Sequence, residues 1–184
     1  VGGNGGDTLT GGSGADILDG GSGSNTLVGG GGNDRLYFDA DASSSFNGGA
    51  HGGGNDMSGI GTTLKGDILD LSHLSGTVNM HSAITTTDRV NGIETIDMTG
   101  NGNQTVVLNA SDVLNIGDAT FDPTGSGSGN LGGLNSAGAV KIDGNVGDVL
   151  KLDDGNWIEI TSKINNEPTN YKVYAHDNNG ATNG

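Results

Sequence analysis

Leucine returns every nine residues near the start of the chain, within a stretch that is otherwise made of glycine and small polar residues. The four leucines are Leu9, Leu18, Leu27 and Leu36. Each sits in a three-residue segment, x-Leu-x, long enough for a short strand with leucine on one side. The six residues between these segments read G-G-x-G-x-D, and their glycines permit turns through positive φ. The pattern predicts alternating turns and strands in a stacked repeat, with the leucines inside.

Four nonapeptides are in phase, and two of them make one coil of turn, strand, turn and strand. They read GGNGGDTLT (2–10), GGSGADILD (11–19), GGSGSNTLV (20–28) and GGGGNDRLY (29–37), with the acidic position at Asp7, Asp16, Asn25 and Asp34. A flexible Gly/Ser linker is the competing interpretation, but a linker does not keep aspartate and leucine in a nine-residue register.

Stacked turns of this composition crowd oxygen atoms along two edges. Every eighteen residues each edge gains one acidic position and a set of backbone carbonyl groups. Such crowding is unfavourable unless a cation lies between successive turns. Ca²⁺ takes about six to eight oxygen ligands from carboxylates and carbonyls, in a tolerant geometry. The glycines therefore favour a backbone that curls to present its carbonyl oxygens to a metal ion.

The motif G-G-x-G-x-D-x-L-x, four times in phase, resembles the calcium-binding nonapeptide of RTX (repeats-in-toxin) proteins, which form a parallel β-roll. The resemblance implies several Ca²⁺ ions, each held between two turns of one edge. Asn25 departs from the motif because its amide oxygen brings no charge, so the site that contains it is expected to be the weaker. Carried onto this sequence, that first site joins Gly2, Asn4 and Asp7 to Gly21, Gly23 and Asn25, and the second joins Gly11, Ser13 and Asp16 to Gly30, Gly32 and Asp34.

After Tyr37 the register fails, and a degenerate G-G-x-G-x-D is stretched by an insertion. Asp39, Asp41 and Asp56 can each complete a further ion site with the last regular turns. For Asp39 and Asp41 an ordinary capping loop with solvated acids explains the residues equally well, whereas the ion is favoured for Asp56. His51 in the same loop is interpreted as a solvated side chain.

From Lys65 onward glycine thins out, and Val, Ile and Thr alternate with polar residues between Gly, Asn and Asp turns. The fold class is therefore all-β: a calcium-bound parallel β-roll over 1–59 that continues into a capping β-solenoid or β-sandwich-like region over 60–184. One short helical turn is expected at "SDVLNI", capped by Ser111. The run D-D-G-N before Trp157 predicts a hairpin turn.

The second region also resembles a known family. "VNGIETIDMTGNGNQTVVLNASDVLNI" (90–116), "VKIDGNVGDVLKLDDGNW" (140–157) and "YKVYA" look like the segment after the RTX repeats in very large bacterial surface adhesins. In those proteins this region ends in a type I secretion target. The chain starts inside the repeat array and stops at "AHDNNGATNG", so we expect a fragment in which the last secretion element is missing.

The charge and the cysteine content limit the classes of partner that this chain is expected to bind. The chain holds 22 acidic and 7 basic residues, a formal charge of −15, and no cysteine. Nucleic acids and acidic membranes need basic patches, so neither is expected as a partner. No run is apolar enough to span a bilayer. We expect a secreted or cell-surface monomer, whose partners are calcium and the type I secretion machinery, with any surface, glycan or peptide ligand bound through other parts of the polypeptide.

Catalysis is not expected, because the sequence contains neither H-E-x-x-H nor G-x-S-x-G and its four histidines are scattered. The predicted function is a non-catalytic Ca²⁺-binding module of a biofilm-type adhesin that folds outside the cell. One alternative is the C-terminal RTX domain of a secreted enzyme. Another is an ice-binding or ligand-binding roll, which the missing Thr/Asx ladder disfavours.

Overall fold

Short parallel strands stacked into coils dominate the computed structural model of this chain. The structure describes residues 1–39, 41, 43–50, 66–81, 89–100, 102–117, 140–155, 157–160 and 173–176. Asp56 and His51 lie outside these residues. The described part is mostly strand with one short helix, which confirms the expected all-β parallel roll. No described helix has the length and apolar character needed to cross a membrane.

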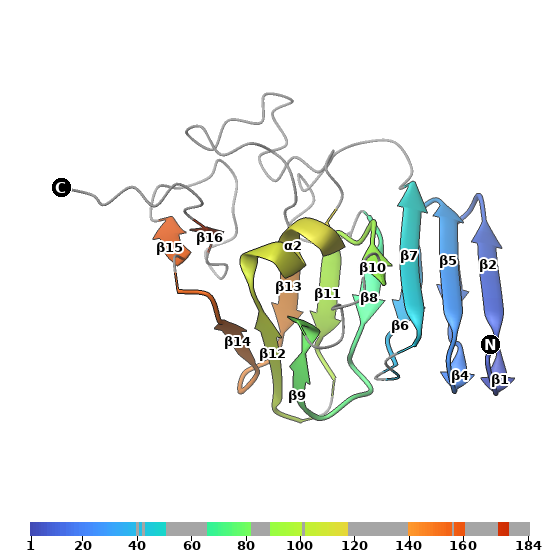
Figure 1. Ribbon diagram of the computed structural model, residues 1–184, viewed down its shortest axis with the longest axis horizontal. Helices are drawn as coiled ribbons and strands as arrows, with labels where there is room; N and C mark the ends of the chain where they lie inside the picture. Colours follow the sequence, from blue (N-terminus) through green and yellow to red (C-terminus); the bar gives the residue numbers. More distant parts are fainter. Residues whose placement is uncertain are drawn as a thin grey trace.

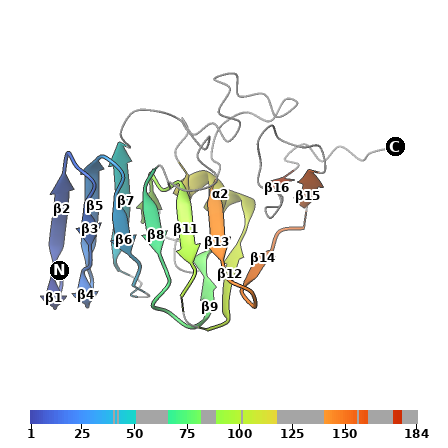
Figure 2. The same ribbon diagram turned by 180° about the vertical axis from the view of Figure 1, so that it is seen from behind.

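The first coils are flattened and two-sided, with one parallel sheet on each side (Figures 1 and 2). One sheet has the order β10-β7-β5-β2 and the other β13-β11-β8-β6-β3, while β1 pairs with β4 at the turn edge. Leu9 lies beside Leu27 and Leu18 beside Leu36, which is the eighteen-residue spacing of the sequence. The strands are β1 (Gly3–Asn4), β2 (Thr8–Gly12), β3 (Ile17–Leu18), β4 (Gly21–Ser22), β5 (Thr26–Gly31), β6 (Arg35–Tyr37) and β7 (Ser45–Ala50).

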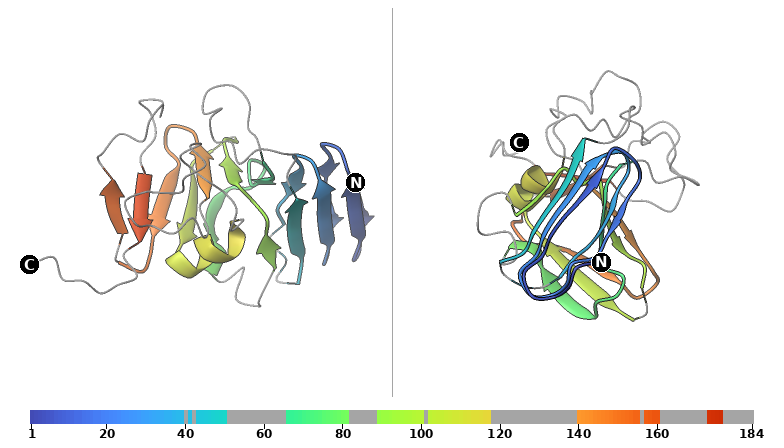
Figure 3. Two further views of the ribbon diagram at one scale, coloured as in Figure 1. Left: turned by 90° about the horizontal axis from the view of Figure 1, so that it is seen from above. Right: turned by 90° about the vertical axis from the view of Figure 1, so that its right-hand side faces the viewer.

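Later coils acquire a third side. A three-stranded parallel sheet of order β14-β12-β9 joins the two sheets that continue from the first coils. Viewed along the stack, the coils lie over one another around a common axis (Figure 3, right). The strands are β8 (Ile68–Asp70), β9 (Gly76–Asn79), β10 (Val90–Asn91), β11 (Thr95–Met98), β12 (Gln104–Leu108), β13 (Lys141–Gly144) and β14 (Val149–Leu152).

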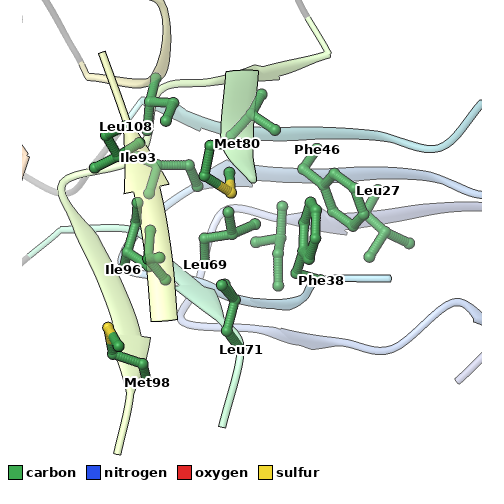
Figure 4. Packing of buried hydrophobic residues seen from close by; sticks show 14 of the residues in the cluster. Leu27, Phe38, Phe46, Leu69, Leu71, Met80, Ile93, Ile96, Met98 and Leu108 are labelled. Carbon is green, nitrogen blue, oxygen red and sulfur yellow. The ribbon is translucent and has the colours of Figure 1, made fainter. Parts of the chain in front are cut away.

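Inward side chains form rows that run through all the coils. On one sheet Leu27 is followed by Phe46 and Val90, and on the other Leu36 is followed by Leu69 and Ile96. These side chains belong to one buried cluster, in which Phe38 and Phe46 pack with ring centroids 5.1 Å apart (Figure 4). Each fully buried aliphatic or aromatic side chain stabilises the fold by roughly 1.5–3 kcal/mol. The core is therefore continuous from the repeats into the later coils.

The short helix α2 (Ala110–Ile116) follows β12 and contacts β10, the last strand of its sheet. It occupies the position in the coil where β10 stands one coil earlier. Its cap is Asn109, so the expectation of Ser111 was wrong. The Asn109 side chain accepts the Asp112 N–H, and the Asp112 carboxylate accepts the Asn109 N–H, which satisfies two backbone donors at once.

The expected hairpin before Trp157 was also wrong. β14 pairs in parallel with β12, whereas β15 (Trp157–Ile160) pairs antiparallel with β16 (Val173–His176). The turn after β14 thus connects two different sheets. Asp154 holds it by accepting the Ala110 N–H at 2.8 Å and the indole N–H of Trp157 at 2.5 Å.

Candidate metal centre

Two columns of polar side chains follow the turn edges of the coils. The first ladder consists of Asp7, Asn25 and Ser44, and the second ladder of Asp16, Asp34, Asp67 and Glu94. Each member ends a turn, and from the second member of each ladder onward the side-chain oxygen accepts the backbone N–H of the member before it. The stacking of turns thus brings together side chains that are far apart in the sequence.

In the first ladder, Asn25 Oδ1 accepts the Asp7 N–H at 3.1 Å and Ser44 Oγ accepts the Asn25 N–H at 2.9 Å. In this column the acidic character ends after Asp7, because an amide and a hydroxyl take the next two positions.

The second ladder is acidic throughout. Asp34 Oδ1 accepts the Asp16 N–H at 2.8 Å, and Asp67 Oδ1 accepts the Asp34 N–H at 2.7 Å. Glu94 Oε2 in turn accepts the Asp67 N–H at 2.5 Å. Four carboxyl groups therefore repeat at the spacing of neighbouring strands, about 4.8 Å.

Sequence reasoning missed Asp67 and Glu94 because the nine-residue register breaks before them. A signal was present nonetheless. The run D-I-L-D of residues 16–19 recurs unchanged at 67–70, and E-T-I-D at 94–97 has the same pattern. In each run the acid ends a turn, and the residue two positions later points into the core.

The first glycine of each turn makes close packing against these carboxylates possible. A Cβ added to Gly29 would collide with Asp34 Oδ2 of its own turn and, at 2.5 Å, with the Gly48 carbonyl oxygen of the next coil. The next residue, Gly30, has a φ of 107°, a backbone conformation that residues other than glycine rarely adopt. Glycine here lets oxygen atoms approach the backbone closely.

The donor set suits a hard cation. Asp7 Oδ2 and Asp34 Oδ2 are buried and accept no hydrogen bond within the described structure. Asp34 is only 1% exposed, and burial raises the pKa of its carboxyl group; the Asp16 N–H opposes this rise and the Asp16 charge adds to it. Across the described ranges no three His, Cys, Asp or Glu side chains gather tightly enough to hold a metal. An ion here would therefore need turn carbonyl oxygens as well as carboxylates.

A family model decides what these turns are. The model for the RTX calcium-binding nonapeptide repeat matches residues 1–36 in four copies. Residues 1–36 are an RTX calcium-binding β-roll. The resemblance to RTX repeats that the sequence indicated is thus confirmed for this part of the chain. Repeats of this kind suggest a secreted protein. Searches of curated proteins and of solved structures gave no match.

The structure brings together the turns of the first predicted site in the RTX roll. Gly3 pairs with Gly21 and Asn4 with Ser22, so the two turns lie directly over one another. Asn25 uses both ends of its amide. Its Oδ1 accepts the Asp7 N–H, while its Nδ2 donates to the carbonyl oxygens of Gly23 at 2.9 Å and Gly21 at 3.4 Å. Carbonyl groups predicted to bind an ion thus already have a donor.

The turns of the second predicted site are also stacked. Gly12 pairs with Gly30, and the Asp16 and Asp34 ends are joined by the second ladder. Here both acidic positions carry a carboxylate, and Asp34 Oδ2 is buried without a donor. Of the two predicted sites, this one has the stronger ligands.

The third turn of the first edge contains Asp39 and Asp41. Asp39 accepts the Asp41 N–H at 3.0 Å and the Asn25 amide at 3.3 Å, and Asp41 accepts the Ser24 hydroxyl at 3.1 Å. Arg89, only 7% exposed, donates to the backbone carbonyls of Ser44 and Asp41. These contacts favour the capping loop over an ion site, because a guanidinium already supplies positive charge there.

A second group of aspartates lies on the outer face of the five-stranded sheet. This face row consists of Asp70, Asp97 and Asp143, which are neighbours in the sheet register. Arg35 pairs with Asp70 and, at 2.8 Å, with Asp97, while Lys141 pairs with Asp143 at 2.6 Å. Burial disfavours the Asp97 carboxylate, but hydrogen bonds from Thr99 and the charge of Arg35 outweigh burial and lower its pKa.

Proposed function

We propose that this chain is a non-catalytic, calcium-folded module of a type I-secreted bacterial surface adhesin. The observation that carries the proposal is the second ladder. It stacks the carboxyl groups of Asp16, Asp34, Asp67 and Glu94 along one edge, and Asp34 Oδ2 is buried there without a donor. Such an edge is costly unless a cation neutralises it.

The residues that would hold the ions are Asp7, Asp16 and Asp34, together with carbonyl groups of the glycine turns. Calcium, when bound, supplies the positive charge that these oxygen atoms lack. A ladder hydrogen bond from the Asp16 N–H holds Asp34 Oδ1 in place, which leaves Asp34 Oδ2 for the ion. The glycines keep the turns narrow enough for two coils to share it.

Calcium availability would then decide when the repeats fold. The chain carries a formal charge of −15 and 38 glycines, so self-repulsion and backbone entropy both oppose collapse without the ion. In a module of this kind, the free energy of ion binding is folding free energy. The unfolded chain is the form that a type I channel can thread, and calcium outside the cell would make export hard to reverse.

The later coils would serve as the base on which the repeats assemble. β6 pairs with β8 and β7 pairs with β10, so strands on both sides of the roll find partners beyond the repeats. The inner rows of leucine, phenylalanine and isoleucine are also continuous across this junction. In the adhesin, this arrangement would cap one end of the roll, which covers apolar core and strand edges.

A calcium titration followed by far-UV circular dichroism tests the proposal. Extracellular calcium modules bind at about 10⁻⁴–10⁻³ M, whereas cytosolic sensors respond at about 10⁻⁷–10⁻⁵ M. We expect a gain of β-structure with a midpoint in the extracellular range and loss of that structure in EDTA. A β-rich spectrum that EDTA leaves unchanged, or a midpoint at micromolar calcium, would refute calcium-timed folding during export.

A further inference from the structure

The second ladder is longer than the recognised repeats. Asp67 and Glu94 lie outside residues 1–36, yet they occupy the same position in the ladder as Asp16 and Asp34. Asp67 is fully buried and Asp34 almost so. The acidic edge therefore does not end where the sequence motif ends.

Gly48 and Gly49, at the end of β7, repeat the geometry of the first two glycines of a repeat turn. A Cβ on Gly48 would collide with Asp67 Oδ2 at 2.5 Å, as a Cβ on Gly11 would with Asp16 Oδ2 at 2.6 Å. The next glycine, Gly49, pairs with Gly30 and has φ of 101° against 107° for Gly30. Two features of a repeat turn thus recur at residues that the family model does not match.

Oxygen atoms gather where these two turns meet. Asp34 Oδ2, which has no donor, and the Gly48 carbonyl oxygen both lie where they would collide with a Cβ on Gly29. The Asp67 carboxylate joins them from the next coil, since its Oδ1 accepts the Asp34 N–H at 2.7 Å. Carboxylate and carbonyl oxygens at the junction of two glycine turns are the donor set that suits Ca²⁺.

We propose that Asp34, Gly48 and Asp67 form a calcium site one coil beyond the recognised repeats. The proposal rests on the calcium-dependent folding proposed above and adds a residue set to it. It assigns to Asp67 the role that the sequence suggested for Asp56. The site would tie the repeats to the later coils, since Asp34 belongs to the former and Asp67 to the latter.

The first ladder differs at the corresponding position of the same coil, where no metal ion is proposed. There Ser44 stands in place of the carboxylate, and the guanidinium of Arg89 donates to the carbonyls of Ser44 and Asp41. In this coil the first ladder ends at Ser44, beside the positively charged Arg89 side chain. In the same coil the second ladder continues with an acidic residue, Asp67. The two edges of one coil differ in their source of positive charge.

Counting bound calcium tests the proposal on the full chain. Equilibrium dialysis against radioactive calcium gives the number of ions per chain for the wild type, Asp67→Asn and the control Asp143→Asn. Asparagine keeps an oxygen that can accept the Asp34 N–H, as Asn25 does for Asp7. Asp143→Asn makes the same change of charge on the outer face, beside Lys141.

We expect Asp67→Asn to bind one ion fewer than the wild type, and Asp143→Asn to bind the wild-type number. An Asp67→Asn chain with the wild-type number and affinity overturns this site but leaves calcium-dependent folding intact. A wild type that binds no calcium overturns the proposed function instead. If Asp67→Asn does not fold, the wild-type number decides: more ions than the two sites within the repeats support the proposal, and two or fewer overturn it.

Discussion

Aspartates stack one above another in two parts of this molecule, and the two stacks are neutralised differently. On the outer face, Asp70, Asp97 and Asp143 meet Arg35 and Lys141, so the positive charge belongs to the chain itself. Along the second ladder, Asp34 has hydrogen bonds to one oxygen only, and its other oxygen is buried without a donor. The face row has its cations within the chain, whereas in the proposed function the second ladder takes its cation from solution.

The difference separates stability that is always present from stability that depends on the surroundings. Ion pairs within the chain form as soon as the strands meet, with or without calcium in the medium. Carboxylates that wait for calcium stabilise the fold only where calcium is plentiful. The face row lies mainly on the later coils and the ladders mainly on the repeats, so these two regions should respond differently to the same conditions.

Removal of calcium should have the largest effect. In EDTA we expect the backbone amides of residues 1–36 to lose protection from hydrogen exchange, while β11 and β12 keep theirs. The reason is that Ile96, Val106 and Leu108 are fully buried in the core and Asp97 has its own cation. Hydrogen exchange followed by mass spectrometry measures both regions in one sample. Equal loss of protection in the two regions would show that the coils fold only as one unit.

The next effect should come from single acids within the ladders. Asp16→Ala removes a charged ligand, whereas Asn25→Ala removes an amide whose NH₂ group already donates to turn carbonyls. We expect Asp16→Ala to weaken calcium binding by about 1.4–2.8 kcal/mol, roughly ten- to a hundredfold, and Asn25→Ala to weaken it less. Calorimetric titration of both variants measures this. Equal losses would argue against the assigned pairs of turns.

The smallest effect should appear in the acid response of the face row. Because Thr99 and Arg35 hold the pKa of Asp97 below its value in the unfolded chain, about 3.9, its stabilisation is present above that pH and is lost as the pH falls through the folded pKa. With calcium saturating, we expect protection of β8 and β11 to fall in this acid window. Arg35→Met should lower that protection at neutral pH and flatten its dependence on pH. An unchanged profile in the variant would mean that Arg35 does not control Asp97.

The sequence predicted the repeats well because their geometry is local. Nine residues contain a whole turn and strand, so Asp16, Leu18 and their copies reveal the coil without any knowledge of distant contacts. Asp67 was missed because an insertion separates it from the repeats, and its place in the second ladder follows only from the pairing of β6 with β8. The D-I-L-D pattern at residues 67–70 indicates that Asp67 ends a turn, but it does not show that Asp67 lies beside Asp34.

Contacts between distant residues were beyond the reach of any local pattern. Arg89 lies 45 residues from Ser44, and nothing near it in the sequence indicates a partner at the first edge. The third sheet is similar: alternation predicted β12 and β14 as strands, but the pairing of Val106 with Val78 and Leu150 depends on how many residues each coil uses. Helix capping failed for a smaller reason, since Asn109 and Asp112 form a reciprocal pair that Ser111 does not join.

The helix α2 has a consequence for how copies of this molecule can associate. A solenoid whose two ends both expose matching strand edges can join head to tail and grow into a filament. β2 is the terminal strand at one end of the four-stranded sheet, where the strand of a further coil could pair with it in register. At the other end the terminal strand is β10, and α2 occupies the place where the next strand would pair. One of the three sides of the template is thus a helix, which cannot continue the hydrogen-bond ladder. On this side the two ends of the stack therefore differ: the ladder can gain a strand beside β2, whereas α2 cannot extend it beyond β10.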